Sequence, residues 1–514
     1  MRSTIALAAT GVFSAALVAS CSFDAFCLDG SSDCVDAGCA DGLRNGDETD
    51  VDCGGSCGPC GTGLACSEDV DCEAGRCAQE ACCDVPCTMW SRSWGSLVDD
   101  RATAIAVSSD GSIYVAGRFS GAVEFGLGPL ISRGVDIFVL RLGPDGALRW
   151  GKSFGGVLDD AEVELAVTAS GSIVLAVGGA SQSVDFGGGP LESPGNVNLY
   201  LAELDATGAH VWSRALQTDT EAHPAGLAIA PDGDLLVSGS MYDVDAGGGV
   251  LASLGGLDPF LVRLSPTGEH RWSKRFGSVW HDLGGRVATD AEGNAYITAN
   301  YSRAWSFGGD LLPWANGTGC LAVAKLDPHG EHVWSHGYAD GVGTVGQIAR
   351  DIVVDELGTT WVTGSFGDAT DFGAGVLEPG VGSIAMLLAY APDGSLRLVR
   401  ALGEHTSTGL GLTPDGAGGV ALVGSFRGDV DFGGGVRLER GIDHVFVSRF
   451  DRDGNAAWAR SGGGQLTSDP ARVAREATTG SFILAGGFRG ELDIAFGGVK
   501  SAGESDTFVL AVEP

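Results

Sequence analysis

Residues 110–117 read DGSIYVAG, and residues 136–150 read DIFVLRLGPDGALRW. The first stretch is a turn glycine followed by a β-rich run. The second joins another β-rich run, through a tight Pro-Asp-Gly turn, to a run that ends in tryptophan. With the Ala/Val-rich run TAIAV from Thr103, these stretches supply four short strands between Thr103 and Trp150. This unit decides the fold, because the rest of the chain repeats it.

Three landmarks of this unit recur along the chain. The glycine-led run begins at Gly111, Gly171, Gly233, Gly293, Gly358, Gly416 and Gly480. The second run begins at Asp136, Asn198, Pro259, Cys320, Ala385, His444 and Thr507. The tryptophan is found at Trp90, Trp150, Trp212, Trp272, Trp334 and Trp458, with Leu398 in the remaining position. Seven units spaced by 60 to 64 residues, without helical periodicity, predict an all-β protein: a seven-bladed β-propeller of four-stranded blades.

The ends of the repeat region predict a closed ring over residues 88–514. The last unit stops at Pro514 after its third strand, whereas TMWSRSWG from Thr88 is a fourth strand with no unit before it. We expect this N-terminal strand to complete the last blade, which removes the free sheet edges that promote aggregation. An open solenoid is the alternative architecture.

The repeats resemble the bacterial β-propeller-repeat family, sometimes called SBBP repeats. The DGxxYVAG and DxFVxxLxxxG runs carry the resemblance over residues 88–514. It implies an exported propeller and little about activity, since the members of that family are mostly of unassigned function. LDATGAHVW from Leu204 and LDPHGEHVW from Leu326 are similar to tryptophan-docking repeats of quinone-dependent and of cofactor-free scaffold propellers. This second similarity implies that the tryptophans pack blade against blade.

The chain opens with an export signal. Arg2 precedes an apolar run that starts at Ile5, and Leu17–Ser20 lead to Cys21. The pattern is similar to bacterial lipoprotein signals, which implies that residues 1–20 are removed and that Cys21 carries the lipid. In those lipoproteins a residue such as Ser22, rather than aspartate, favours the outer membrane. We therefore expect an exported, membrane-anchored lipoprotein facing the periplasm or the cell surface; an ordinary secretory peptide is the alternative.

Residues 21–87 are predicted to form a small disulfide-rich segment. Besides Cys21 they contain an even set of cysteines: Cys27, Cys34, Cys39, Cys53, Cys57, Cys60, Cys66, Cys72, Cys77, Cys82, Cys83 and Cys87. In an exported chain this set indicates up to six bridges of unknown pairing. The CxxC spacing of Cys57 and Cys60 also suits zinc or redox chemistry. The segment lacks histidine and a βαβ setting, so disulfides remain the preferred interpretation.

The stretch from Asp41 to Cys60 resembles cysteine-rich segments that bacterial surface lipoproteins carry between anchor and main domain. That resemblance implies a compact stalk without catalytic residues. Asp47, Asp50 and Asp52 have the spacing of alternate ligands in a calcium loop, and Gly54 follows them. They are candidate calcium ligands, although the glutamate that completes an EF-hand loop is missing. A solvated acidic turn is the alternative.

Composition limits the partners. The chain has 31 basic and 66 acidic residues, a net charge of −35. Such a surface repels nucleic acid and anionic lipid, so we expect no nucleic-acid partner and a membrane contact only through lipid on Cys21. No GxSxG, HExxH or phosphate-loop motif occurs, and Cys320 heads a strand as a small buried residue. The sequence thus offers no signature of an enzyme.

Candidate ligand-binding residues lie in the connections between blades. Short turns inside each blade build one face of the ring, which has little reach, and the connections with the long loops build the other. The connections carry Asp99, Asp100, Asp159, Asp160, His281, Asp282 and Asp469. They are expected to ring the channel mouth, where carboxylates bind cations or basic ligands; local capping of each turn is the alternative.

A second set of acids recurs in the long loops, at Glu124, Asp185, Asp245, Asp371 and Asp431. An acid beside an aromatic residue suits carbohydrate contact, whereas repeated glycines favour anchoring of the loop. The leading hypothesis is a surface-anchored recognition or scaffold propeller that binds a protein or a glycan. The alternatives are a polysaccharide-active enzyme that uses the acidic rim, and a calcium-stabilised structural protein of the surface.

Overall fold

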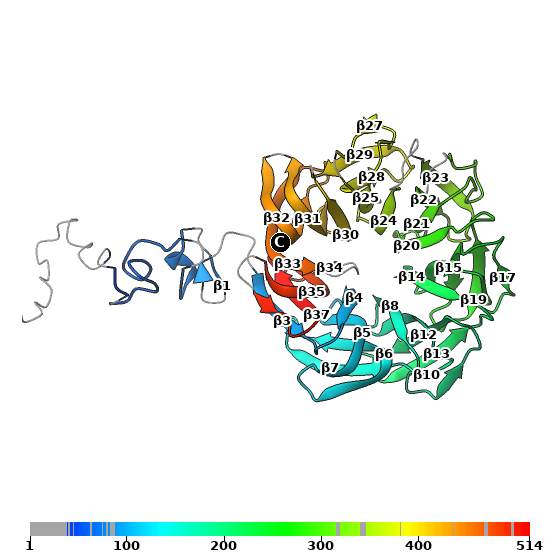
Figure 1. Cartoon of the computed structure of the whole chain (residues 1–514), viewed down its shortest axis with the longest axis horizontal. Helices are drawn as coiled ribbons and strands as arrows, with labels where there is room; N and C mark the ends of the chain where they lie inside the picture. The colour runs from blue at the N-terminus through cyan, green and yellow to red at the C-terminus, as the bar shows by residue number, and fades with distance from the viewer. Residues whose placement is uncertain are drawn as a thin grey trace, which may run out of the picture.

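The computed structural model describes residues 39, 42–44, 46–61, 64–73, 76–78, 81–82, 88–314, 319–339, 346–380, 382–403, 405–433, 435–466, 471–494 and 498–514. The strands after residue 87 form seven antiparallel blades around a ring, as predicted, and a small segment extends from the side of that ring (Figure 1). Cys21, Cys27, Cys34, Cys83, Cys87 and Asp469 lie outside the described residues.

Each blade has four strands, which follow one another from the channel outward. Blade 1 consists of β4 (Arg101–Val107), β5 (Ile113–Glu124), β6 (Pro129–Leu142) and β7 (Leu148–Phe154). Blade 2 consists of β8 (Asp160–Val167), β9 (Ile173–Gly179), β12 (Asn198–Leu204) and β13 (His210–Leu216). Blade 3 consists of β14 (Ala222–Ile229), β15 (Leu235–Met241), β18 (Asp258–Leu264) and β19 (His270–Arg275). Blade 4 consists of β20 (Leu283–Thr289), β21 (Ala295–Tyr301), β22 (Cys320–Leu326) and β23 (His332–Tyr338).

The remaining blades follow the same order. Blade 5 consists of β24 (Ile348–Val354), β25 (Thr360–Phe366), β28 (Ile384–Tyr390) and β29 (Leu396–Leu402). Blade 6 consists of β30 (Ser407–Pro414), β31 (Val420–Gly433), β32 (Val436–Phe450) and β33 (Ala456–Leu466). Blade 7 consists of β34 (Arg472–Arg475), β35 (Phe482–Ile494), β37 (Asp506–Val512) and β3 (Thr88–Trp94). Short hairpins in the long loops, such as β10 (Ser183–Asp185) with β11 (Pro190–Glu192), form separate two-stranded sheets, and β1 (Cys77–Ala78) with β2 (Ala81–Cys82) forms another before the ring.

The ring closes through the two ends of the repeat region. β3 pairs antiparallel with β37, with Trp90 opposite Ala511 and Trp94 opposite Thr507. Figure 1 shows this N-terminal strand beside the last strand of the chain. Each innermost strand contacts that of the next blade, and β34 of blade 7 contacts β4 of blade 1. The predicted closure is therefore confirmed, and the open solenoid is excluded.

Neighbouring blades share their hydrophobic cores. Second and third strands such as β15, β25 and β28 are buried along their whole length. Their polar residues are small, and Ser238 and Thr363 donate hydrogen bonds to backbone carbonyls. One core joins Ala104 and Tyr114 of blade 1 to Leu175 and Tyr200 of blade 2. A blade therefore depends on its neighbours on both sides for burial of its apolar surface.

The repeated tryptophans dock one blade onto the turn of the next. Trp150 Nε1 donates a hydrogen bond of 3.0 Å to the carbonyl of Ala206, and Trp272 Nε1 donates one of 2.9 Å to the carbonyl of Pro328. Trp212 differs, because its Nε1 donates to Glu203 Oε2. The predicted packing of blade against blade is thus observed. Cys320 is fully buried, as expected.

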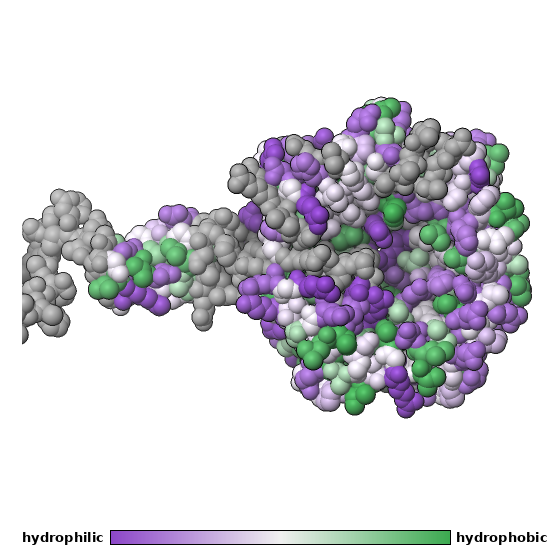
Figure 2. All heavy atoms as spheres, in the orientation of Figure 1, coloured by the Kyte–Doolittle hydropathy of each residue, from purple (hydrophilic) through white to green (hydrophobic). Residues whose placement is uncertain are grey.

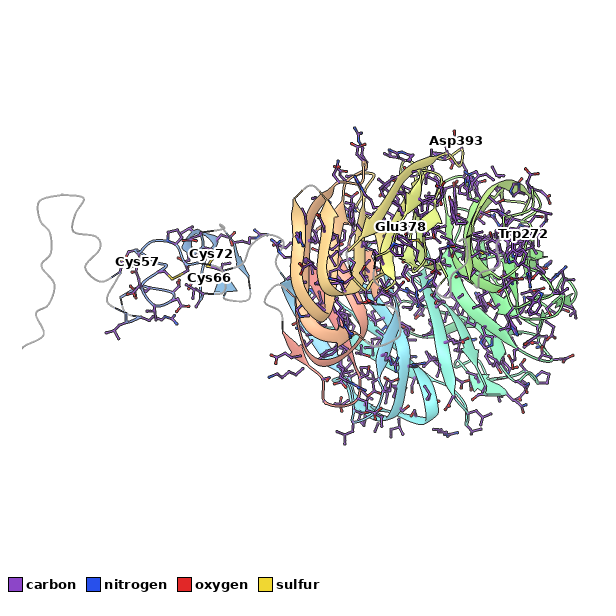
Figure 3. The ribbon with its side chains drawn as sticks, turned by 45° about the horizontal axis from the view of Figure 1, so that its top comes forward. Cys57, Cys66, Cys72, Trp272, Glu378 and Asp393 are labelled. Carbon is purple, nitrogen blue, oxygen red and sulfur yellow. A yellow bond between two sulfur atoms is a disulfide. The ribbon has the colours of Figure 1, made fainter. Side chains whose placement is uncertain are left out.

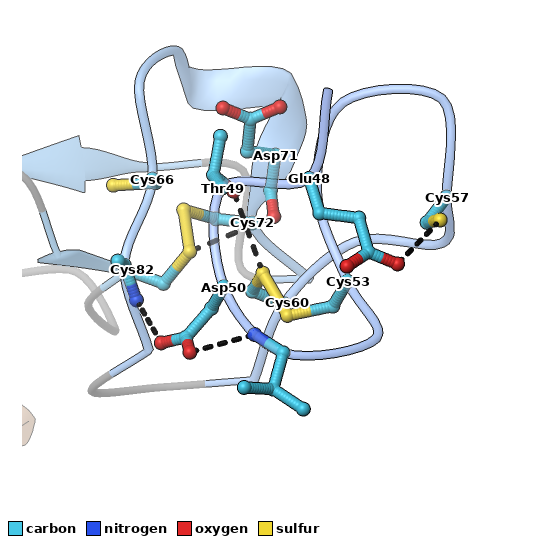
Figure 4. The surroundings of a disulfide bond; sticks show 12 residues. Glu48, Thr49, Asp50, Cys53, Cys57, Cys60, Cys66, Asp71, Cys72 and Cys82 are labelled. Carbon is cyan, nitrogen blue, oxygen red and sulfur yellow. Dashed lines mark hydrogen bonds between the residues drawn. A yellow bond between two sulfur atoms is a disulfide. The ribbon is translucent and has the colours of Figure 1, made fainter. Parts of the chain in front are cut away.

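The described part of residues 39–82 is held by four disulfide bonds, and we call it the disulfide segment (Figure 4). The pairs are Cys39–Cys57, Cys53–Cys60, Cys66–Cys77 and Cys72–Cys82. Figure 4 shows the second and the fourth of these bonds. Cys57 and Cys60 belong to different bridges, so they are not a redox pair. Figure 3 shows Cys57, Cys66 and Cys72 beside the ring. Arg76 Nε donates to Glu513 Oε1 at 2.9 Å, which joins the segment to the end of blade 7.

No helix among the described residues has the length and apolar character that crossing a membrane requires.

Candidate functional site

The ring has two faces of different construction. The tight-turn face carries the turns inside each blade, such as residues 108–112 and 143–147 of blade 1. The connection face carries the connections between blades, such as residues 155–159. The tips of the long loops reach back along the outermost strands, where Gly126 lies near Leu148 and Gly187 near His210. The sequence-predicted ligand residues belong to the connection face.

Three of the predicted rim carboxylates are fully buried. The side chain of Asp100 accepts hydrogen bonds from the backbone of Ser96 and Ser120, at 2.6 and 3.1 Å. Asp160 does the same with Gly156 and Ser181. Asp282 is the third, and its carboxylate accepts from Ser278 at 2.6 Å and from Ser302 at 2.8 Å. The expectation that these three carboxylates line an open rim is wrong, because each joins its connection to the end of the second strand.

Burial acts on the acidity of two of these groups. It raises the pKa of Asp100 and of Asp160 above the ordinary aspartate value, although their backbone hydrogen bonds oppose the shift. Loss of solvent is the larger effect for both. These carboxylates are structural turn caps rather than groups offered to a ligand.

The preceding position in each connection lies closer to solvent. Asp159 is exposed, and its Oδ1 accepts the backbone N–H of Val135 at 3.0 Å. His281 is also exposed, and its Nδ1 accepts the N–H of Leu257 at 3.2 Å. Asp99 forms ion pairs with Arg101 and Arg118. These residues lie on the connection face as predicted, and each already has a local partner.

The acids of the long loops are also engaged by their own loops. Asp185 Oδ1 accepts the N–H groups of Gly187 and Gly189 at 2.7 and 3.0 Å, and Phe186 beside it is buried. The same pair of glycine contacts recurs at Glu124, Asp245 and Asp371, and the first of them at Asp431. Local anchoring therefore explains this repeat.

The candidate calcium ligands each have separate donors. Asp47 accepts from Ser56 Oγ at 2.7 Å, and Asp52 accepts from the N–H of Gly42 at 2.9 Å. Asp50, which is drawn in Figure 4, accepts from the N–H of Ala65 at 2.7 Å. Among the described residues, two groups bring three metal-ligating atoms together: Cys66, Cys72, Cys82, and Cys39, Glu48, Cys57. All five of their sulfur atoms are in disulfides, so neither group offers a thiolate.

Charged side chains of non-adjacent blades meet inside the channel. Glu164 on β8 of blade 2 forms an ion pair with Arg286 on β20 of blade 4, across the width of blade 3. His223 on β14 lies between two acids: its Nδ1 is 2.9 Å from Glu162 Oε1, and its Nε2 is 3.7 Å from Glu221 Oε2. We name Glu162, Glu164, His223, Arg286 and Asp351 the channel cluster.

The narrow channel shifts the titration of this cluster. Loss of solvent raises the pKa of Glu164 to about 7 and that of Asp351 to about 6, against the attraction of Arg286. The hydrogen bond with Glu162 raises the pKa of His223. Sequence reasoning missed the cluster. In the sequence, the cluster is visible only as polar residues within the Ala/Val-rich first strands. Which of these residues pair with one another depends on how the ring arranges blades that are not adjacent.

The connection face also displays apolar side chains. Leu97, Val157 and Val279 occupy equivalent connections and expose 80%, 71% and 67% of their surface. Trp280 follows Val279 and exposes 54%. Large exposed apolar groups that recur at one end of a fold are typical of an interaction surface. In Figure 2 one face of the molecule shows separate hydrophobic patches among hydrophilic residues, around a central hollow.

Two clefts open between the turns of the tight-turn face. One, of about 500 Å³, lies between blades 4 and 5 and is lined by Asp290, Lys325 and Asp355. The other, of about 520 Å³, lies between blades 2 and 3 and is lined by Thr168, Glu203 and Pro231. The turns are short as expected, but neighbouring blades leave space between them.

Comparisons with known proteins add no argument about this chain. No family model and no curated protein matches the chain. Solved structures that match include the WD40 domain of Pan2 from Neurospora crassa (12% identity, 83% of this chain and 97% of that chain, TM-score 0.40). A PL25 ulvan lyase bound to -[GlcA(1-4)Rha3S]- also matches (10% identity, 77% and 93%, TM-score 0.42). At this level of similarity neither neighbour carries an argument about function.

Proposed function

We propose that this protein is a non-enzymatic binding propeller that works outside the cytoplasm and receives a protein or glycan ligand on its connection face. The exposed Leu97, Val157 and Val279 carry the proposal. Apolar side chains that stay in solvent at three equivalent connections form a surface that a partner can cover. Asp100, Asp160 and Asp282 are not contacts for this ligand, because local hydrogen bonds already use their carboxylates.

The disulfide segment and the N-terminal signal support the location. Four bridges within residues 39–82 are typical of chains that fold in an oxidising compartment. In this proposal lipid on Cys21 tethers the chain, in the outer membrane, and the disulfide segment separates that anchor from the propeller. A clickable fatty acid should label the wild-type chain in cells and not Cys21→Ser; equal labelling would refute the anchor.

A matched pair of variants tests the connection face. Leu97→Asp adds a charge to the connection face, and Leu357→Asp adds the same charge to a tight turn where Leu357 is also exposed. The full chain, incubated with envelope extract and cross-linked, should lose its partner in Leu97→Asp and keep it in Leu357→Asp. Loss in both variants, or in Leu357→Asp alone, would contradict the proposal.

One observation favours catalysis as a second candidate function. His223 lies between Glu162 and Glu221, and the nearby Glu164 has a raised pKa of about 7, an arrangement suited to acid–base chemistry on a glycan. A turnover screen on polysaccharides should then show activity that His223→Gln removes. Asp282→Asn, which alters a buried cap, should affect stability and leave the rate per folded molecule unchanged. Absence of turnover on every polysaccharide tested would leave the binding function alone.

A further inference from the structure

The connection at blade 4 departs from the repeat in two side chains that touch each other. The guanidinium carbon of Arg303 lies 5.2 Å from the ring centre of Trp280 and 4.1 Å from that of Trp314. Trp280 follows Val279 in the connection before β20, and Arg303 follows the second strand of the same blade. Both belong to the connection face.

Equivalent positions in other blades hold different residues. The N–H groups that cap Asp100, Asp160 and Asp282 belong to Ser120, Ser181 and Ser302, which aligns the residues that follow them: Gly121, Gln182 and Arg303. By the same alignment Trp280 corresponds to Val98 and Leu158. The blade therefore forms with an aliphatic residue and no cation at these places. The pair Trp280 and Arg303 is not a requirement of the propeller repeat.

The pair presents a flat apolar ring and hydrogen-bond donors together. Trp280 is more than half exposed, and Arg303 forms no ion pair with any described residue. His281 adds a donor: its Nδ1 accepts the N–H of Leu257, so its proton lies on Nε2. Tyr242 packs edge-on against the His281 ring, at 6.2 Å between ring centres, and holds it.

We propose that Trp280, His281 and Arg303 form a carbohydrate-binding site. The apolar face of a pyranose ring stacks on the indole, while hydroxyl or carboxylate oxygens of the sugar accept hydrogen bonds from the guanidinium and from His281 Nε2. A sugar suits the site because the two polar groups are donors and sugar oxygens are acceptors. This inference rests on the proposed function and names its ligand class.

Charge defines which glycans suit the site. The chain carries −35 overall, which opposes long polyanions, but salt screens that repulsion beyond about 8 Å at physiological ionic strength. A neutral chain, or a uronate that pairs with Arg303, is compatible with this field. Both offer hydroxyl oxygens as acceptors and only the uronate adds a carboxylate, so the experiment separates them.

Affinity electrophoresis tests the site directly. The full-length protein in detergent is run through native gels that contain galactomannan, a neutral chain, or polygalacturonate, a uronate chain. We expect one or both to retard it; retardation by polygalacturonate alone identifies the carboxylate as the acceptor of Arg303. Trp280→Leu, which installs the residue of blade 2, should abolish retardation, and Arg303→Gln should weaken affinity at least tenfold. The matched variant Leu158→Ala should behave as wild type.

Two results would overturn the site: no retardation by either polysaccharide, or full retardation of Trp280→Leu. Since Trp280 is exposed, unfolding of its variant is not expected, and an unchanged thermal midpoint verifies this. A partner captured in a Leu97-dependent way, with no polysaccharide bound, would leave the binding propeller standing and refute the carbohydrate site. A captured protein that Trp280→Leu releases would likewise reject a glycan as the occupant.

Discussion

Trp90 Nε1 donates a hydrogen bond of 2.9 Å to the carbonyl oxygen of Pro144. Trp90 is the first tryptophan of the chain, yet through β3 it belongs to the last blade, and Pro144 lies in a turn of blade 1. The contact therefore spans the closure of the ring. It is the same docking contact that Trp150 and Trp272 make between consecutive blades.

Trp90→Ala should destabilise the propeller by about 3–5 kcal/mol, since the buried indole leaves a cavity at the closure. Denaturant unfolding followed by circular dichroism measures the loss. The exposed Trp280→Ala is the control and should cost about 0.5 kcal/mol or less. Equal midpoints for the two variants would mean that the closure contributes nothing to stability.

Glycine is required at position 146, beside the ring of Trp90, for two separate reasons. Gly146 has φ +70, and a Cβ there would come within 2.5 Å of Trp90 Cε3. Gly121 has nearly the same φ, +72, but nothing lies within 4 Å of its Cβ position. Gly121→Ala should therefore cost about 1 kcal/mol from backbone strain alone, and Gly146→Ala clearly more. The difference in thermal midpoint between the two variants measures the contribution of the contact with the Trp90 ring. Equal midpoints would show that this contact imposes no requirement for glycine.

The buried rim carboxylates are expected to control stability and not affinity. Asp282→Ala leaves the N–H groups of Ser278 and Ser302 without their acceptor, at a cost of about 2–4 kcal/mol. Asp159→Ala removes one exposed hydrogen bond and should cost about 1 kcal/mol or less. Chemical denaturation gives both values. If the exposed Asp159 proved the costlier loss, the assignment of Asp282 as a turn cap would fail.

Asp351 links stability to pH. Its pKa of about 6 in the fold exceeds the ordinary 3.8, so its contribution to stability is complete below about pH 4 and is lost as the pH rises through 6. Asp351→Asn removes this titration. Relative to wild type, the variant should therefore gain about 1–3 kcal/mol of unfolding free energy between pH 4 and pH 8. If the unfolding free energies of wild type and Asp351→Asn changed in parallel with pH, the pKa of Asp351 in the folded protein would not be raised.

Reduction should loosen the disulfide segment and spare the ring. The four bridges join cysteines only 7 to 18 residues apart, and each contributes about 2–3 kcal/mol by restricting the unfolded segment. With a phosphine reductant, limited proteolysis should cut between residues 39 and 82. All 11 tryptophans lie from Trp90 onward, so an unchanged tryptophan emission reports an intact propeller. A shifted emission would reveal that the ring depends on the bridges.

The spacing of three repeated landmarks predicted seven blades, and the incomplete first and last units predicted their closure, since the β3–β37 pairing only completes a count already visible in the chain. Disulfide bonding followed from cysteine number. Each property is local and repeated, so periodicity in the sequence reports it directly. The sequence did not predict whether the side chains of Asp100, Asp160 and Asp282 point to solvent or into the fold. An aspartate next to a strand can bind a ligand or accept hydrogen bonds from the backbone equally well.

Only the tertiary structure decided which side chains face one another. The pairing of Glu164 with Arg286 needs blades 2 and 4 to meet across blade 3 in one channel, and the contact of Trp280 with Arg303 needs a connection folded over the end of β21. The same holds for the bridge between Cys53 and Cys60. Sequence periodicity determines what each blade repeats. Contacts among residues that do not repeat arise when the ring closes, because closure brings together positions that no local pattern relates.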